Sequence, residues 1–167
     1  MVVKRGGNFV IICLLLLSHG CAAGISNQAR SQVTYEGPFS ELQKASDDYI
    51  GETCLFGGKI LENRASTTFS ELTVLHLATD SRDRPKDDEQ SQGRYLVQSN
   101  QFLDPAIYKK GALLTVVGKL IGKEVRTIGE YKYVYPKLEA IELKVWPETD
   151  YYPFPRFHFG IGVGIID

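Results

Sequence analysis

The chain has 167 residues, of which 43% are hydrophobic, and its formal net charge at pH 7 is −1. This share of apolar residues is ample for one folded domain and excludes a chain that is disordered throughout. The nearly balanced charge lacks the excess of Lys and Arg that nucleic-acid binding requires, so we expect no nucleic acid among the partners.

Residues 1–20 have the three parts of a bacterial export signal. Two basic residues open it, and an unbroken apolar run over residues 9–17 follows. This run is shorter than the ~20 residues that a membrane-spanning helix needs. Cys21 comes directly after Gly20, so we predict cleavage between these two residues. We expect a diacylglycerol thioether on the Cys21 sulfur and an acyl chain on its new amino group.

The cleavage region departs from the usual lipoprotein pattern, because Ser18 stands where Leu is usual and His19 where a small residue is usual. Ordinary secretion with cleavage near Ala22 or Ala23 is therefore the alternative. In known bacterial lipoproteins, an Asp directly after the lipid-bearing cysteine signals retention in the inner membrane. Ala22 occupies that position here, so the resemblance implies a lipid-anchored protein of the bacterial outer membrane.

We expect the mature chain to have three parts. Residues 21–36 are small and polar without periodicity, which is typical of a flexible tether. Residues 37–150 have the apolar patterns of a folded domain. Residues 151–167 form a tail that is rich in aromatic residues, proline and then glycine. Such a tail could pack on the domain, touch lipid headgroups or bind another envelope protein.

Within the domain, residues 38–45 predict a short helix, because Pro38 suits a first turn and the apolar residues after it share one face. The remaining apolar and β-branched runs predict strands at 52–62, 67–77, 93–97, 113–121, 125–135 and 137–146. Gly57 and Gly58 indicate a bulge or a close backbone approach. In the last strand the inward positions shift by one residue near Ala140, which requires a bulge.

The connections follow from turn residues and charge. Residues 63–66 predict a hairpin turn, and the charged run 80–92 predicts a mobile, solvated loop. Strands of this number, with glycines and bulges, favour a mostly β fold. We expect a small closed barrel of the OB type with a short N-terminal helix, because closure removes exposed strand edges. A β-sandwich is the alternative.

No pattern of catalytic or metal-binding residues is found in the sequence. His76 and Cys54 lie in predicted strands, so we expect a structural imidazole and a buried, inert thiol. Glu130 with Glu139 or Glu142 could form the carboxylate pair of a glycosidase, but neighbouring lysines favour solvated strand faces instead. We therefore expect no catalysis, no metal and no cofactor apart from the covalent lipid on Cys21.

Tyr131, Tyr133 and Tyr135 project to one side of a predicted strand. On an OB-type barrel an aromatic face of this kind can bind sugars or nucleobases by stacking. Packing against the core or the tail is the alternative, and the sequence favours it because no basic groove is evident beside the tyrosines. The three residues are thus a possible binding face.

Several short segments have the order and spacing of one known family. They are residues 57–60, 93–95, 102–105, 114–118, 128–130 and 133–136, with Tyr108 and Trp146. Together with the export signal they resemble the Slp family, the starvation-inducible outer-membrane lipoproteins of Gram-negative bacteria. One departure is the pair Cys54-Leu55 before Phe56, where an Arg-Trp-like pair is more typical of the family.

The resemblance implies an outer-membrane lipoprotein with a structural or protective role in starvation, stationary phase or acid stress. It implies no catalytic residues that could be assigned to positions in this chain. The alternative function is a periplasm-facing binding module for an envelope glycan or a partner protein.

Overall fold

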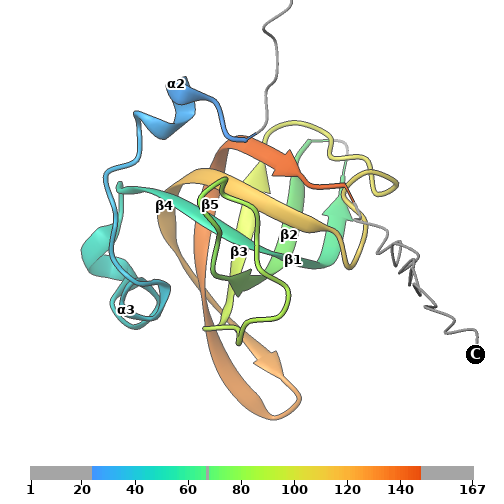
Figure 1. The fold of residues 1–167 in the computed structure, drawn as a ribbon. Helices are drawn as coiled ribbons and strands as arrows, with labels where there is room; N and C mark the ends of the chain where they lie inside the picture. The colour runs from blue at the N-terminus through green and yellow to red at the C-terminus, as the bar shows by residue number, and fades with distance from the viewer. Residues whose placement is uncertain (1–23, 67, 148–167) are drawn as a thin grey trace, which may run out of the picture.

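The computed structural model describes residues 24–66 and 68–147, so the export signal, Cys21 and the tail 151–167 lie outside it. The described part is a five-stranded barrel preceded by short helices (Figure 1). The helices are α2 (Asn27–Arg30), α3 (Phe39–Lys44) and the 3-10 helix η1 (Ser46–Tyr49). The strands are β1 (Thr53–Ala65), β2 (Ser70–Leu77), β3 (Arg94–Ser99), β4 (Leu113–Ile128) and β5 (Tyr131–Val145). No helix among the described residues is long and apolar enough to cross a membrane.

The barrel closes in the order β1-β2-β3-β5-β4, with β4 returning to β1. The strand pairs are antiparallel except for β3 and β5, which run parallel over Leu96–Gln98 and Lys137–Glu139. This small closed barrel confirms the predicted OB-like fold, and the β-sandwich alternative is wrong.

The core fills the inside of the barrel with alternate residues from every strand. The largest of its fully buried side chains include Tyr95, Ile60, Leu72, Leu114, Leu120 and Leu138. Helix α3 contributes Phe39 and Leu42, which are buried in the same cluster. The Phe39 ring lies 5.4 Å from the Phe56 ring and 5.8 Å from the Tyr95 ring, centroid to centroid. The prediction of a short helix here is confirmed.

The predicted strand 125–135 is wrong, because this segment is the end of a long hairpin. Strand β4 continues to Ile128, and the chain reverses at Gly129 and Glu130. Gly129 has a φ of 60°, a left-handed value that glycine adopts without strain in two-residue turns. The hairpin of β4 and β5 extends beyond the rest of the barrel (Figure 1).

The bulge predicted near Ala140 is confirmed. Val117 pairs with Glu142 and Gly118 pairs with Ala140, so Ile141 is the extra residue. The sequence pattern suggested that Ile141 faces the core, but it is 42% exposed and does not.

The paired glycines on β1 mark a close backbone approach rather than a bulge. A Cβ at Gly58 would overlap the carbonyl oxygen of Leu75 on the neighbouring strand. The bulge of β1 lies further along, between Ile60 and Glu62, so Leu61 is its extra residue. The turn predicted at 63–66 is displaced, because β1 runs to Ala65 before the chain reverses.

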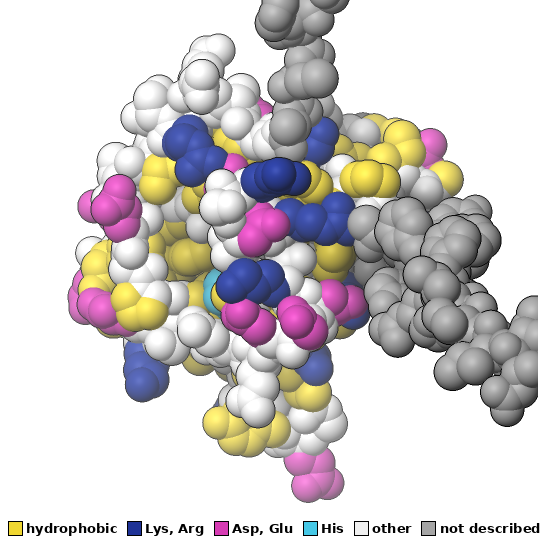
Figure 2. Space-filling model, in the orientation of Figure 1, with side chains coloured by type: hydrophobic (Ala, Val, Ile, Leu, Met, Phe, Trp, Pro, Cys, Tyr) yellow, Lys and Arg dark blue, Asp and Glu magenta, His cyan; other side chains and the backbone are white. Residues whose placement is uncertain are grey.

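The loop 80–92 is anchored and not fully solvated, contrary to the prediction. Asp83 is 7% exposed, and its carboxylate pairs with Arg30. Its carbonyl oxygen accepts a hydrogen bond of 2.5 Å from the Thr115 hydroxyl. On the face shown in Figure 2, positive and negative side chains lie side by side rather than in separate patches.

The predicted flexible tether is wrong for residues 24–36, which pack on the barrel. Ile25 and Ala29 of the α2 region are buried against Val117 of β4. The backbone N–H of Ser26 donates a hydrogen bond of 2.8 Å to the Glu142 carboxylate on β5. The N-terminal segment is therefore fixed to β4 and β5 by apolar contact and hydrogen bonding.

A candidate binding site under the long hairpin

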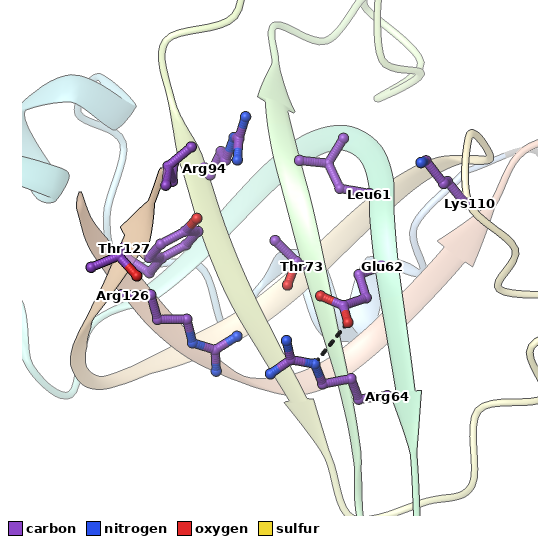
Figure 3. A pocket seen from close by; sticks show the side chains of 10 residues that line it. Leu61, Glu62, Arg64, Thr73, Arg94, Lys110, Arg126 and Thr127 are labelled. Atoms are coloured by element: carbon purple, nitrogen blue, oxygen red, sulfur yellow. Dashed lines mark hydrogen bonds and ion pairs between the residues drawn. The ribbon is translucent and has the colours of Figure 1, made fainter. Parts of the chain in front are cut away.

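A pocket of about 520 Å³ lies on the outer face of the barrel between the first three strands and the hairpin (Figure 3). This volume is within the range of small-molecule sites. The lining residues are Leu61, Glu62 and Arg64 of β1, Thr73 of β2, Arg94 of β3, Lys110 from the loop before β4, and Arg126, Thr127, Ile128 and Tyr135 of the hairpin.

The lining residues of β1, β2 and β3 face away from the core because side chains alternate along a strand. On β2, Leu72 and Val74 are fully buried in the core, so Thr73 between them faces the opposite side. On β3 the fully buried Tyr95 follows Arg94, so Arg94 also faces away from the core. On β1, Leu61 follows the buried Ile60 and so faces outward, and the bulge at Leu61 brings Glu62, which is opposite Thr73, to the same outer face.

The hairpin presents tyrosines and an arginine on one face. Residues directly opposite each other on paired strands share a face, and Arg126 is opposite Tyr133 while Ile128 is opposite Tyr131. Tyr135 is on the same face and lines the pocket. The structure therefore brings the possible binding face Tyr131, Tyr133 and Tyr135 to the side of the hairpin that carries Arg126.

The three tyrosines differ in how much of the ring is free. Tyr131 is 71% exposed at the tip of the hairpin, whereas Tyr135 is only 4% exposed. The Tyr133 ring lies 4.9 Å from that of Tyr135, and its hydroxyl accepts a hydrogen bond of 2.9 Å from the backbone N–H of Arg94. Tyr131 is thus available to a ligand, while Tyr133 and Tyr135 hold the hairpin against the barrel.

Arg126 ties the hairpin to β2 through an ion-pair network. Its guanidinium donates to the carboxylates of Glu71 at 2.6 Å and Glu124 at 2.8 Å. The ammonium of Lys137 lies 3.6 Å and 3.7 Å from the same two carboxylates. The hydrogen bond with Glu124 raises the pKa of Arg126, and the same bond lowers the pKa of Glu124. The four charged side chains of this network are therefore paired with one another.

Two other cations in the pocket have no such ion-pair partner in the described structure. Within the described part of the chain, no hydrogen bond or ion pair is found for the guanidinium of Arg94 or the ammonium of Lys110. Arg64 pairs with Glu62 at 2.8 Å, but both side chains are about half exposed to solvent. The basic lining beside the tyrosines corrects the expectation that no basic groove accompanies them, and Arg94, Lys110 and Arg126 were not predicted as site residues.

Comparison with known proteins identifies the family. The model of the "Outer membrane lipoprotein Slp family" matches residues 18–160. The chain belongs to the Slp family. Its relatives include the uncharacterised lipoprotein YeaY of Escherichia coli K12, which is 29% identical over 80% of this chain and 69% of YeaY. The outer membrane protein Slp of the same strain is 27% identical over 82% of this chain and 73% of that protein.

Family membership places this Slp-family protein at the bacterial outer membrane as a lipid-anchored protein. Solved structures that match part of the chain include a single-stranded DNA-binding protein of Streptomyces coelicolor, at 13% identity and a TM-score of 0.37, covering 57% of this chain and 94% of that one. The mitochondrial single-stranded DNA-binding protein Rim1 of S. cerevisiae has a TM-score of 0.36 at 19% identity, with the same coverage. Scores this low say nothing about a ligand of this chain.

The carboxylates considered for catalysis are spread over the hairpin turn and β5 of the Slp-family barrel. Glu130 is exposed in the hairpin turn, whereas Glu142 accepts hydrogen bonds from Ser26 near the other end of the strand. Glu139 accepts a hydrogen bond of 3.2 Å from Asn100. Among the described residues, no group of three or more His, Cys, Asp or Glu side chains could hold a metal ion.

Cys54 and His76 are both buried in the Slp-family barrel. Burial raises the pKa of the Cys54 thiol to about 12, which fits the expected inert thiol. The His76 ring stacks on Phe39 at 4.4 Å, and burial lowers its pKa to about 4. Figure 2 shows only a sliver of histidine surface between neighbouring side chains.

Proposed function

We propose that the barrel is a non-catalytic binding module for an envelope glycan and that lipid on Cys21 holds it at the outer membrane. The observation that carries this proposal is the pocket under the hairpin, whose lining combines arginines, a lysine and Tyr135, with Tyr131 and Tyr133 on the same face of the hairpin. OB-type barrels commonly bind oligosaccharides or oligonucleotides at the face of their second and third strands and the adjoining loops. That support is an analogy between folds, and the residues of the site supply the rest.

The lining favours a sugar over an apolar protein segment. Protein contacts are usually strongest where aromatic or aliphatic side chains fill apolar pockets, whereas only Leu61 and Ile128 supply aliphatic surface here. Arg94 and Lys110 offer hydrogen-bond donors, and the exposed Tyr131 ring, opposite the lining residue Ile128, offers a face on which a sugar can stack. A partner protein remains the alternative ligand, and the experiment below distinguishes the two.

Adjacent residues on opposite faces of the hairpin provide a matched test. A photo-crosslinking amino acid at position 131 would sit on the pocket side, and the same group at exposed Lys132 would sit on the other side. In intact cells we expect an adduct from position 131 that stains for carbohydrate and little adduct from position 132. A protein adduct from position 131 supports the alternative ligand. Equal adducts from both positions, or none from 131, would contradict binding at this face.

The role in starvation or acid stress that the family resemblance implies is also part of our proposal for this protein. A strain lacking the protein should survive starvation or an organic-acid challenge less well than its parent. Restoring the gene should restore survival. If the deletion strain survives as well as its parent under both conditions, the protective role is wrong, whereas the binding site would be unaffected.

A further inference from the structure

We infer that the pocket selects an acidic saccharide, a sugar chain bearing carboxylate or phosphate groups, and that Arg94 and Lys110 bind those groups. The inference rests on the proposed function, because it specifies the ligand of the same site. It follows from the balance of charge around the pocket and from which of those charges are already paired.

The pocket and its ion-pair network hold more positive than negative charge. The five cations are Arg64, Arg94, Lys110, Arg126 and Lys137, and the three carboxylates are Glu62, Glu71 and Glu124. Each carboxylate is within ion-pair distance of a cation of this set. Two positive charges are therefore in excess here, although the whole chain carries a net charge of −1.

The excess corresponds to the two cations that have no ion-pair partner in the described structure. Arg94 is partly buried at the start of β3, and its backbone N–H is held by the Tyr133 hydroxyl of the hairpin. Its guanidinium therefore projects from a fixed backbone with its donors unused. A planar guanidinium can donate two parallel hydrogen bonds to one carboxylate or phosphate, which gives it geometric selectivity for these groups.

Lys110 supplies the second charge from another part of the pocket. It is exposed in the loop before β4, and the loop is held beside β1 because Gly111 N–H donates to the Ile60 carbonyl at 2.8 Å. In Figure 3, Arg94 and Lys110 lie on opposite sides of Thr73. A ligand that satisfies both cations must span the pocket, so a saccharide with more than one acidic unit fits better than a single small anion.

The test uses the full-length protein in a neutral detergent and titration calorimetry with defined probes. Tetragalacturonate is the acidic probe and maltotetraose is the neutral probe of equal length. Inorganic phosphate and phosphatidylglycerol vesicles test the other sources of negative charge. We expect binding of tetragalacturonate that weakens when NaCl is raised from about 0.05 M to about 0.5 M, since salt screens exposed charges.

The variants separate the two unpaired cations from other basic residues. Arg94→Gln and Lys110→Gln should each weaken tetragalacturonate binding about tenfold, the usual loss for one hydrogen bond to a charged group. Lys132→Gln is the matched control, because Lys132 is an exposed cation on the opposite face of the same hairpin. This control should bind tetragalacturonate as the unchanged protein does. Circular dichroism of each variant checks that the fold is retained.

The outcomes distinguish failure of the proposed glycan-binding function from failure of the acidic ligand alone. Binding of tetragalacturonate that depends on Arg94 and Lys110 supports both the function and the inference. Equal binding of maltotetraose, insensitive to Arg94→Gln and Lys110→Gln, overturns the acidic ligand but leaves a glycan-binding module. Binding of neither saccharide overturns both, and so does tighter binding to phosphate or to the phosphatidylglycerol vesicles.

Discussion

We expect acidification to destabilise this barrel in part through a buried side chain, His76 of β2. The imidazole is 7% exposed, and its ring stacks on Phe39 at 4.4 Å with an angle of 14° between the planes. Phe56 contacts it edge-on at 5.5 Å. Its Nδ1 is buried without a hydrogen-bond partner in the described structure. An imidazolium here would lack water and any paired charge, which is why burial lowers the pKa to about 4 from 6.5.

The direction of the pH effect follows from comparing the two states. The unfolded chain takes up the His76 proton near pH 6.5, whereas the folded chain does so only near pH 4. Between these values the unfolded state binds more protons, so the free energy of unfolding falls as the pH falls. The loss begins near pH 7, amounts to about 2 kcal/mol at pH 5 and reaches about 3 kcal/mol below pH 4.

Thermal unfolding of the full-length protein in neutral detergent, followed by circular dichroism, measures this loss. Between pH 7 and pH 5 the Tm of the unchanged protein should fall by roughly 8 °C, taking about 4 °C per kcal/mol for a domain of this size. His76→Phe should abolish most of that fall, because phenylalanine keeps the ring contact with Phe39 and cannot be protonated. His76→Gln serves the same purpose if the phenylalanine packs poorly.

Carboxylates do not confound the comparison, because the unchanged protein and both variants share them. A role for His76 in acid destabilisation is refuted if the unchanged protein, His76→Phe and His76→Gln show the same change in Tm between pH 7 and pH 5. It is also refuted if an NMR titration of the folded protein shows His76 protonating near pH 6.5.

The remaining predictions concern the anchor, the β1–β2 contact and the N-terminal segment. Cys21→Ser should move the protein from the outer-membrane fraction to the soluble periplasm; persistence in the membrane would contradict the anchor. Gly58→Ala should lower the free energy of unfolding by roughly 1–3 kcal/mol in urea denaturation, because the new methyl group overlaps the Leu75 carbonyl oxygen. Ala29→Asp should expose residues 24–36 to limited proteolysis and leave the barrel protected, whereas Gln28→Asp on the exposed side of α2 should not.

The features of the fold that could be predicted are those with a residue-level pattern. Helix α3 follows a proline and places Phe39 and Leu42 on one face, which the core then buries. The bulge of β5 is visible because inward positions on either side of Ile141 differ by an odd number of residues. Both signals are local, so the sequence contains them without any knowledge of the neighbouring strands.

The hairpin turn and the packed N-terminal segment could not be predicted, because their residues have no periodic apolar pattern. Residues 121–134 extend past the core, so their apolar residues follow no single inward face, and Val125 is 56% exposed. The reversal has only Gly129 as a turn signal. Helix α2 is one turn long and is held by Ile25 and Ala29, too few apolar residues to produce a periodic pattern.

The candidate site is hidden in the sequence because its cations come from separate elements. Arg94 starts β3, Lys110 lies with Lys109 in a loop and Arg126 is near the end of β4, so the three cations are far apart in the sequence. Only closure of the barrel and the fold of the hairpin bring them to one pocket. The tyrosines were recognisable because they alternate within one strand, which is a pattern that the chain itself carries.

The length of β4 and β5 is best understood through this pocket. Strand β5 pairs with β3 only over Lys137–Glu139, and β4 pairs with β1 only over Leu113–Lys119. The outer part of the hairpin, Lys123–Tyr135, therefore pairs only within itself. An isolated two-stranded hairpin is marginal in water, yet this one is held to β2 by Arg126 and to the start of β3 by Tyr133. The barrel closes without the outer part of the hairpin, whereas the pocket is lined on one side by its residues.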